Sequence, residues 1–212
     1  MLTTPFVALD DARGGGTRPL ALYSGAREIV TASRRDEVRP ALTALRRHVA
    51  EGRHVAGFLA YEAGHALEPR LSAIPERGAE TPLLWFGVFD APQFVPPETL
   101  LGAVAGREVR VSAPEPDLDA PRYAAALAEV KALIEAGDIY QANLTFPTGL
   151  AIEGHPLALY ARLRRAQRMG HGAVVFTGRE WILSFSPELF FTLSGGVLQT
   201  RPMKGTAPRR PL

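Results

Sequence analysis

Residues 173–203 carry the pattern of four short strands joined by tight turns, which limits the possible folds more than any other part of the sequence. AVVF and WILSFS flank a Thr-Gly-Arg-Glu turn, and LFFTLS and VLQTRPM flank Gly195-Gly196. A glycine pair supplies the positive φ that a tight hairpin needs. Two strands joined by such a short turn must run antiparallel. The sequence therefore predicts an antiparallel β-meander in this part of the chain.

Three other segments have apolar residues spaced three and four apart, which places them on one face of a helix. The expected inward residues are Val38, Leu42, Leu45 and Val49 in 36–52, Tyr123, Leu127, Val130 and Ile134 in 121–137, and Leu159, Leu163 and Ala166 in 155–170. Further strands are predicted at 28–32, 54–61, 83–91, 106–113 and 139–152, those at 54–61 and 83–91 being buried on both faces. We expect an α/β chain of the α+β type, with antiparallel β-sheets flanked by helices.

The acidic, proline-rich stretch 113–120 has no periodicity and predicts a linker between an N-terminal region, 1–112, and a second region, 121–212. Lys and Arg total 24 against 22 Asp and Glu, a balance that does not suggest a nucleic-acid or membrane surface. The first residues lack a basic region followed by an apolar one, so no secretory signal is expected, and the strongly apolar run 83–89 is too short to span a bilayer. We therefore expect a cytoplasmic protein.

The densest basic run is predicted to form a solvated helix face, with docking of an acidic partner as the alternative. Its residues are Arg162, Arg164, Arg165 and Arg168. The sequence has no cysteine, which excludes disulfides, thiolate metal sites and cysteine nucleophiles. Its five histidines lack ligand spacing, so no metal site is predicted in this chain.

Glu188 and Lys204 are the best candidates for chemistry. If the second hairpin turns at its glycine pair, 189–194 runs back beside 197–203 and these two residues come close at the open end. A lysine beside a carboxylate, on the rim of an apolar sheet, can lose its proton near neutral pH. The neutral amine is a nucleophile, and the carboxyl group can protonate a leaving oxygen. The alternative is a surface ion pair at the end of the hairpin.

Two neighbouring stretches could bind a ligand. Gly205 would let a substrate approach the backbone, and Thr206 adds a hydrogen-bond donor and acceptor. Tyr140, Gln141 and Asn143 are polar where a buried strand should be apolar, so they need partners if they are buried. They form either a structural hydrogen-bond network or part of a pocket, and the pattern leaves both open.

Three motifs, GDIYQANLT, FSPELFF and TRPMKGTAPR, in this order and spacing, resemble the chorismate-utilising enzymes. GFLAYEAGHALEP (57–69) and PLLWFGVFDAP (82–92) are similar to the N-terminal portion of that family. The lysine in PMKGT looks like the branch that makes para-aminobenzoate for folate, whereas the anthranilate branch has alanine there. The resemblance implies a two-layer α/β sandwich, of which this chain would be a truncated, N-terminal half.

The resemblance also implies roles for the residues singled out above. Lys204 would attack chorismate at C2 with loss of the C4 hydroxyl, and Glu188 would be the general acid–base. Ammonia from a glutamine amidotransferase subunit would then add at C4, giving 4-amino-4-deoxychorismate. Gly205 and Thr206 would bind the substrate. Mg²⁺ would hold the chorismate carboxylate through ligands in the missing C-terminal half, so the chain alone would be inactive.

Several members of the family bind tryptophan, and the residues here that match their pocket are Ser24, Tyr140 and Asn143. Two alternatives to the para-aminobenzoate assignment remain open. One is an anthranilate synthase-like enzyme of the same fold. The other is a non-catalytic module that binds an amino acid or docks a glutaminase.

Overall fold

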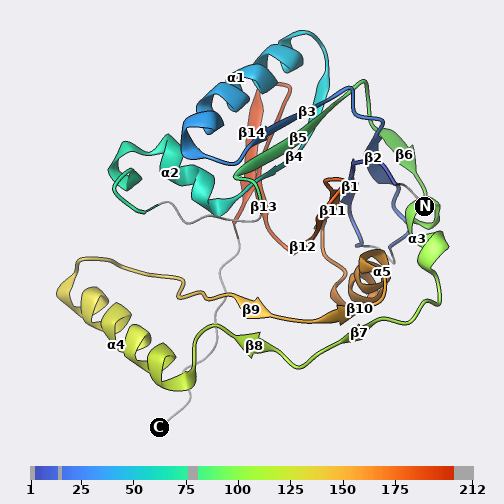
Figure 1. The fold of residues 1–212 in the computed structure, drawn as a ribbon. Coiled ribbons are helices and arrows are strands. Elements are labelled where there is room, and N and C mark those ends of the chain that lie inside the picture. The colour runs from blue at the N-terminus through green and yellow to red at the C-terminus, as the bar shows by residue number, and fades with distance from the viewer. Residues whose placement is uncertain (1–2, 14–15, 76–80, 203–212) are drawn as a thin grey trace. The chain divides into compact units, whose positions relative to one another are not determined.

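The computed structural model describes residues 3–13, 16–75 and 81–202 (Figure 1). They belong to two compact units. The larger unit combines the chain up to Ala105 with the chain from Pro156 onward, and the smaller unit is Gly106–His155. The predicted division into 1–112, 113–120 and 121–212 stays a prediction. It follows the order of the sequence, whereas strand pairing in the structure joins residues that are far apart in the sequence.

A five-stranded antiparallel sheet lies at the centre of the larger unit, in the order β12-β11-β1-β2-β6. Its strands are β1 (Phe6–Asp10), β2 (Leu20–Ser24), β6 (Gln93–Val95), β11 (His171–Phe176) and β12 (Trp181–Ser186). The central strand β1 pairs with β11 from Phe6 opposite Phe176 to Asp10 opposite Gly172. The N-terminal strand and the first strand of the predicted meander therefore lie side by side (Figure 1).

A second antiparallel sheet contains β3 (Glu28–Ala32), β5 (Leu84–Phe89) and β4 (His54–Leu59), in that order. The middle strand β5 is buried along nearly its whole length, as predicted, whereas β4 is an edge strand and only half-buried. The two sheets pack together through a cluster that includes Val7, Trp85 and Val175. Side chains alternate between the faces of a strand, so Val7 faces the second sheet while Asp10 points to the opposite face.

Helix α1 (Arg35–Ala50) covers the outer face of the three-stranded sheet (Figure 1). The prediction that Val49 faces inward is wrong, because that side chain is 54% exposed. The buried row is Val38, Ala41, Leu45 and His48. These spacings of three, four and three also follow a helix face, and His48 comes near the sheet strand β3 with its Nε2 3.2 Å from a carboxylate oxygen of Glu28.

Helix α5 (Pro156–Gln167) packs against β12 with a face that the sequence did not predict. Leu159 and Leu163 are half-buried and Ala166 is exposed. The buried residues are Leu157, Ala158, Tyr160 and Arg164. Hydrogen bonds determine this face, because Tyr160 and Arg164 both bond to Asp10 and therefore point toward the sheet.

The two predicted hairpins are confirmed, but the prediction that they form one continuous meander is wrong, because β12 does not pair with β13 and the two hairpins lie in different sheets. β11 and β12 form one hairpin, and β13 (Leu189–Ser194) and β14 (Val197–Arg201) form another. Gly195 and Gly196 adopt φ of 56° and 79° in the second turn. The remaining short elements of the larger unit are η2 (Tyr61–Ala63), α2 (Gly64–Leu67), η3 (Pro69–Leu71), α3 (Pro97–Leu101) and η4 (Gly102–Val104). The predicted α/β class, antiparallel sheets flanked by helices, is confirmed.

The smaller unit consists of α4 (Ala120–Ala136) and two short strand pairs, β7 (Arg110–Val111) with β10 (Ile152–Glu153) and β8 (Glu115–Pro116) with β9 (Thr148–Gly149). Helix α4 begins and ends within one residue of the predicted range 121–137. The Asp119 carboxylate accepts a bond from the Arg122 N–H at its start, and Gly137 takes φ 82° at its end. None of its residues is buried, so the face predicted to point inward stays open.

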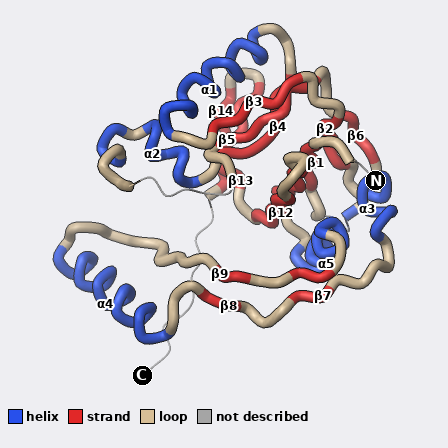
Figure 2. The backbone as a smooth tube through the Cα atoms, in the orientation of Figure 1, coloured by secondary structure: helices blue, strands red, loops and turns tan. Residues whose placement is uncertain are grey.

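The strands predicted at 106–113 and 139–152 are much shorter than expected. Between α4 and β9 the chain is a loop (Figure 2). A strand is stabilised by its ladder, and no described residue pairs with 139–147. In the described ranges of both units, no helix is long and apolar enough to cross a membrane.

Candidate functional site

Glu188 lies at the corner where β12 leads into β13. The Ser186 hydroxyl accepts a hydrogen bond from the Glu188 N–H at 3.1 Å and donates one to the Glu188 carbonyl at 3.0 Å. Pro187, between them, has no N–H to donate and restricts the backbone further. The corner therefore presents an exposed carboxylate on a backbone that one serine side chain holds in place.

The hairpin that follows brings its two ends together as predicted. Leu189 lies opposite Arg201, and Ser194 lies opposite Val197 across the turn. Arg201 is three residues before Lys204 in the sequence. Lys204, Gly205 and Thr206 lie outside the described residues, so their approach to Glu188 stays a prediction.

The hairpin carries large apolar side chains that are open to water. The most exposed are Phe190, Phe191, Leu193, Val197 and Leu198. An amine is desolvated only where apolar groups exclude water from it. The predicted loss of the Lys204 proton stays a prediction, because Lys204 lies outside the described residues.

The three residues proposed for a tryptophan-type pocket fall in both units. Ser24 ends β2 in the larger unit, opposite Phe6, and is half-buried. Tyr140, which is 88% exposed, and Asn143 lie in the loop after α4 of the smaller unit. Exposed polar groups can hydrogen-bond to water, so Tyr140, Gln141 and Asn143 do not need the structural hydrogen-bond network that was one of the two sequence-based alternatives. The pocket stays a prediction.

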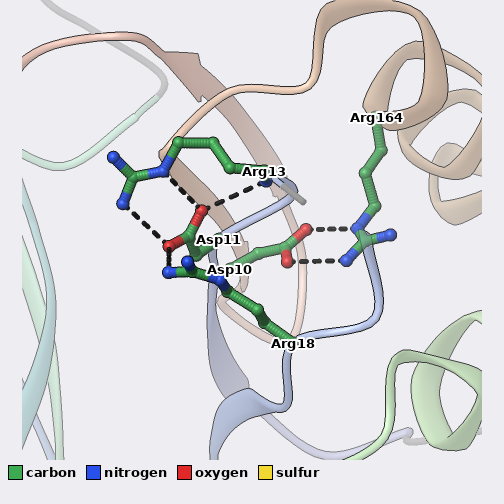
Figure 3. Close-up of polar contacts among 5 residues, drawn as sticks. All are labelled: Asp10, Asp11, Arg13, Arg18 and Arg164. Atoms are coloured by element: carbon green, nitrogen blue, oxygen red, sulfur yellow. Dashed lines mark hydrogen bonds and ion pairs between the residues drawn. The ribbon is translucent and has the colours of Figure 1, made fainter. Parts of the chain in front are cut away.

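Sequence reasoning missed a buried ion pair at the end of β1 (Figure 3). The Arg164 guanidinium donates from Nε to Asp10 Oδ2 at 2.5 Å and from Nη2 to Oδ1 at 3.0 Å. The Tyr160 hydroxyl donates to Oδ2 at 3.0 Å. The Asp10 side chain is 1% exposed and that of Arg164 is 8% exposed. The prediction of a solvated arginine face is therefore wrong for Arg164, although the other three arginines are exposed.

The Asp10 carboxylate raises the pKa of both of its partners in this cluster. Burial raises the pKa of Tyr160, and the nearby Asp10 carboxylate raises it further, so the phenol stays protonated and able to donate. The hydrogen bond to Asp10 likewise raises the pKa of Arg164. Two parallel N–H···O bonds between a guanidinium and a carboxylate are among the stronger contacts in proteins. A signal was present in the sequence: an apolar run, FVAL, ends in two aspartates.

Asp11, the next residue, makes a similar but more exposed pair (Figure 3). Its carboxylate lies 2.8 Å from Nη2 of Arg13 and 2.5 Å from Nη1 of Arg18. The hydrogen bond from Arg13 holds the pKa of Asp11 well below its usual range. The arginine side chains are 47% and 57% exposed, so water competes with both contacts.

Gly172→Ala is expected to destabilise the protein by about 1–3 kcal/mol, because a Cβ at this position crowds the buried cluster. It would lie 2.5 Å from the Tyr160 hydroxyl and 3.4 Å from the Asp10 Cβ. Urea unfolding measures the loss. Gly64→Ala is the control, since a Cβ there meets nothing within 4 Å. Equal unfolding midpoints for both variants would contradict the crowding.

No group of three or more His, Cys, Asp or Glu side chains in 3–13, 16–75 and 81–202 could hold a metal ion.

Comparison with known proteins links the chain to chorismate enzymes. The family model described as chorismate binding enzyme matches residues 103–211, a range that contains Glu188 and Lys204. Aminodeoxychorismate synthase component 1 of Salmonella typhimurium is 40% identical over 87 residues, covering 41% of this chain and 19% of that protein. The Klebsiella aerogenes protein of the same name is 32% identical over 112 residues, covering 53% and 25%.

Anthranilate synthase component 1 of Thermus thermophilus is also similar, at 32% identity over 108 residues, covering 51% of this chain and 23% of that protein. The chain thus spans about a fifth to a quarter of the length of the curated relatives it matches.

Proposed function

The chain belongs to the chorismate binding enzyme family, and from this premise we propose that it serves the amination of chorismate at C4 to 4-amino-4-deoxychorismate. One observation carries the proposal: the hairpin whose open end bears Glu188 leads directly into the sequence PMKGT. The names of two similar proteins, both aminodeoxychorismate synthase component 1, give further support. The product would serve the synthesis of para-aminobenzoate and folate.

The proposed chemistry uses Lys204 and Glu188. The neutral Lys204 amine forms a bond to C2 of chorismate as the C4–O bond breaks, and Glu188 protonates the departing hydroxyl to give water. Ammonia then forms a bond at C4 while the bond from Lys204 to C2 breaks, which frees the amine. Gly205 and Thr206 are proposed to contact the substrate. The pairing of Leu189 with Arg201 supports this arrangement, because it brings the chain beside Glu188 near the chain that leads to Lys204.

A glutamine amidotransferase is the proposed source of ammonia. The words "component 1" in the names of the relatives support a second component. Mg²⁺ is a proposed cofactor, and no step above depends on it.

An anthranilate synthase-like reaction is the second candidate, favoured by the similarity to the Thermus thermophilus protein. The two candidates give different products. We would incubate the protein encoded by the complete reading frame with chorismate, Mg²⁺ and an ammonium salt, and identify the products by mass spectrometry. We expect 4-amino-4-deoxychorismate. Anthranilate would overturn the proposal in favour of the second candidate, and unconsumed chorismate would favour a non-catalytic module.

We also propose that Tyr140 and Asn143, in the loop after α4, bind tryptophan, whereas the role of Ser24 in the larger unit stays a prediction. Asn143→Ala is expected to weaken binding by about 1–3 kcal/mol through the loss of one hydrogen bond, as measured by calorimetry. Thr145→Ala, an exposed position in the same loop, is the control and should bind as the parent does. Absence of a binding heat for the parent would remove the pocket from this protein.

A further inference from the structure

We propose that the aromatic pair Tyr160–Phe185, anchored by Asp10, positions the Glu188 corner for catalysis. The proposal rests on the proposed function, in which Glu188 is the general acid. Tyr160 and Phe185 are positioning residues here, because neither reaches the reacting atoms and both act through the backbone that carries Glu188.

Strand pairing places the buried cluster and the corner at the same end of the five-stranded sheet. Asp10, the last residue of β1, lies opposite Gly172, and the adjacent residue His171 lies opposite Ser186, the last residue of β12. The end of β1, the start of β11 and the end of β12 are therefore neighbours. Glu188 follows two residues after this end of the sheet.

Tyr160 connects the cluster to β12 directly. Its hydroxyl bonds to Asp10, and its ring stacks on Phe185 with 4.9 Å between ring centroids and 29° between planes. The residue is only 1% exposed. A phenol that is held at its hydroxyl and packed on its face has little freedom, so it fixes where Phe185 lies.

Ser186 completes the connection, since it follows Phe185 and bonds to both the N–H and the carbonyl of Glu188. The Glu188 side chain is exposed, so its direction depends on this backbone rather than on packing around the carboxylate. A shift of Phe185 would therefore move the carboxylate relative to the substrate.

The Asp10–Arg164 ion pair is better explained by the positioning of Tyr160 than by its contribution to stability alone. A buried ion pair loses so much hydration that apolar residues of similar size often stabilise a protein as well or better. At the opposite end of the same hairpin, Phe176 stacks on Trp181 at 4.5 Å and Phe6 packs beside them. That end provides a matched control for ring packing.

Phe185→Leu and Phe176→Leu make the same change at the two ends of one hairpin. In the protein encoded by the complete reading frame, we expect both to lower the melting temperature. We expect Phe185→Leu to lower kcat for amination by at least about tenfold with KM for chorismate within about twofold, since small displacements of a catalytic group are costly. Phe176→Leu should keep kcat within about twofold of the parent. Phe185→Tyr retains the stack and should restore kcat.

A Glu188→Gln background tests whether the effect passes through Glu188. Residues that act as a unit show non-additive losses, so Phe185→Leu should lower the residual kcat no further in that background. An additive loss, or equal losses of kcat in Phe185→Leu and Phe176→Leu, would overturn the positioning role while leaving the proposed function intact. Full activity of Glu188→Gln alone would instead overturn the assigned role of Glu188, and the positioning role with it.

Discussion

Asp10→Ala is expected to lower the free energy of unfolding by about 3–5 kcal/mol, the usual loss when one partner of a buried ion pair is removed. Arg164 is left as a buried charge whose two bonds to the carboxylate are gone (Figure 3). The Tyr160 hydroxyl also loses its acceptor. For a chain of this size the melting temperature should fall by on the order of 10 °C. Urea unfolding and thermal melting measure both quantities.

Asp11→Ala is the matched control, because Asp11 is the adjacent aspartate and also pairs with arginines. Its partners are half exposed, so the loss should be much smaller than for Asp10 (Figure 3). Replacing both Asp10 and Arg164 by leucine should recover much of the stability lost in Asp10→Ala, since no unpaired charge remains. Equal destabilisation by Asp10→Ala and Asp11→Ala would contradict the importance of burial.

The features that depend on neighbouring residues were predicted well from the sequence. The turn at Gly195 and Gly196 needs positive φ, which glycine adopts without a steric penalty, so the hairpin β13–β14 could be placed to within a residue or two. Gly137 ends α4 for a similar local reason, whereas the N-terminal cap at Asp119 was not predicted. Pro187, which has no N–H to donate, is likewise a local signal for the corner at Glu188.

Features that depend on distant partners were predicted poorly. The inward face of α5 is set by Asp10, which lies 154 residues before Arg164, and an apolar count along the helix does not contain that information. Strand β1 was not predicted, because it is stabilised by a distant partner: Phe6 in β1 pairs with Phe176 in β11. A strand predicted over 139–152 met no described partner for most of its length and formed only short pairs. Apolar spacing therefore predicted where the helices occur in the sequence but not which face of each helix is buried.

The candidate site likewise has a part that was predicted from neighbouring residues and a part that depends on distant ones. The sequence led to Glu188, whose surroundings are local, and the structure adds the contacts that hold its corner from α5 and β1. The buried pair was missed because arginine and aspartate are mostly exposed in proteins, and a buried one is recognised only from its partner.

Lys204→Ala is expected to reduce formation of 4-amino-4-deoxychorismate by on the order of 10³-fold or more in the protein encoded by the complete reading frame, because the proposed nucleophile is removed. Lys204→Arg should fail to a similar degree, since a guanidinium stays protonated and cannot attack carbon. Lys131→Ala is the control: Lys131 is the other lysine of this sequence and is exposed on α4, so activity should be unchanged.

Mass spectrometry tests the covalent step that this prediction assumes. A reaction with chorismate and no ammonia, quenched in acid and digested, should contain the peptide with Lys204 increased in mass by chorismate minus water, because C2 gains the amine as the C4 hydroxyl leaves. The peptide with Lys131 should be unmodified. Near-parent formation of the 4-amino product by Lys204→Ala would show that no bond to Lys204 is needed. In that case ammonia displaces the C4 hydroxyl without an enzyme-bound adduct, and Lys204 contributes only its charge.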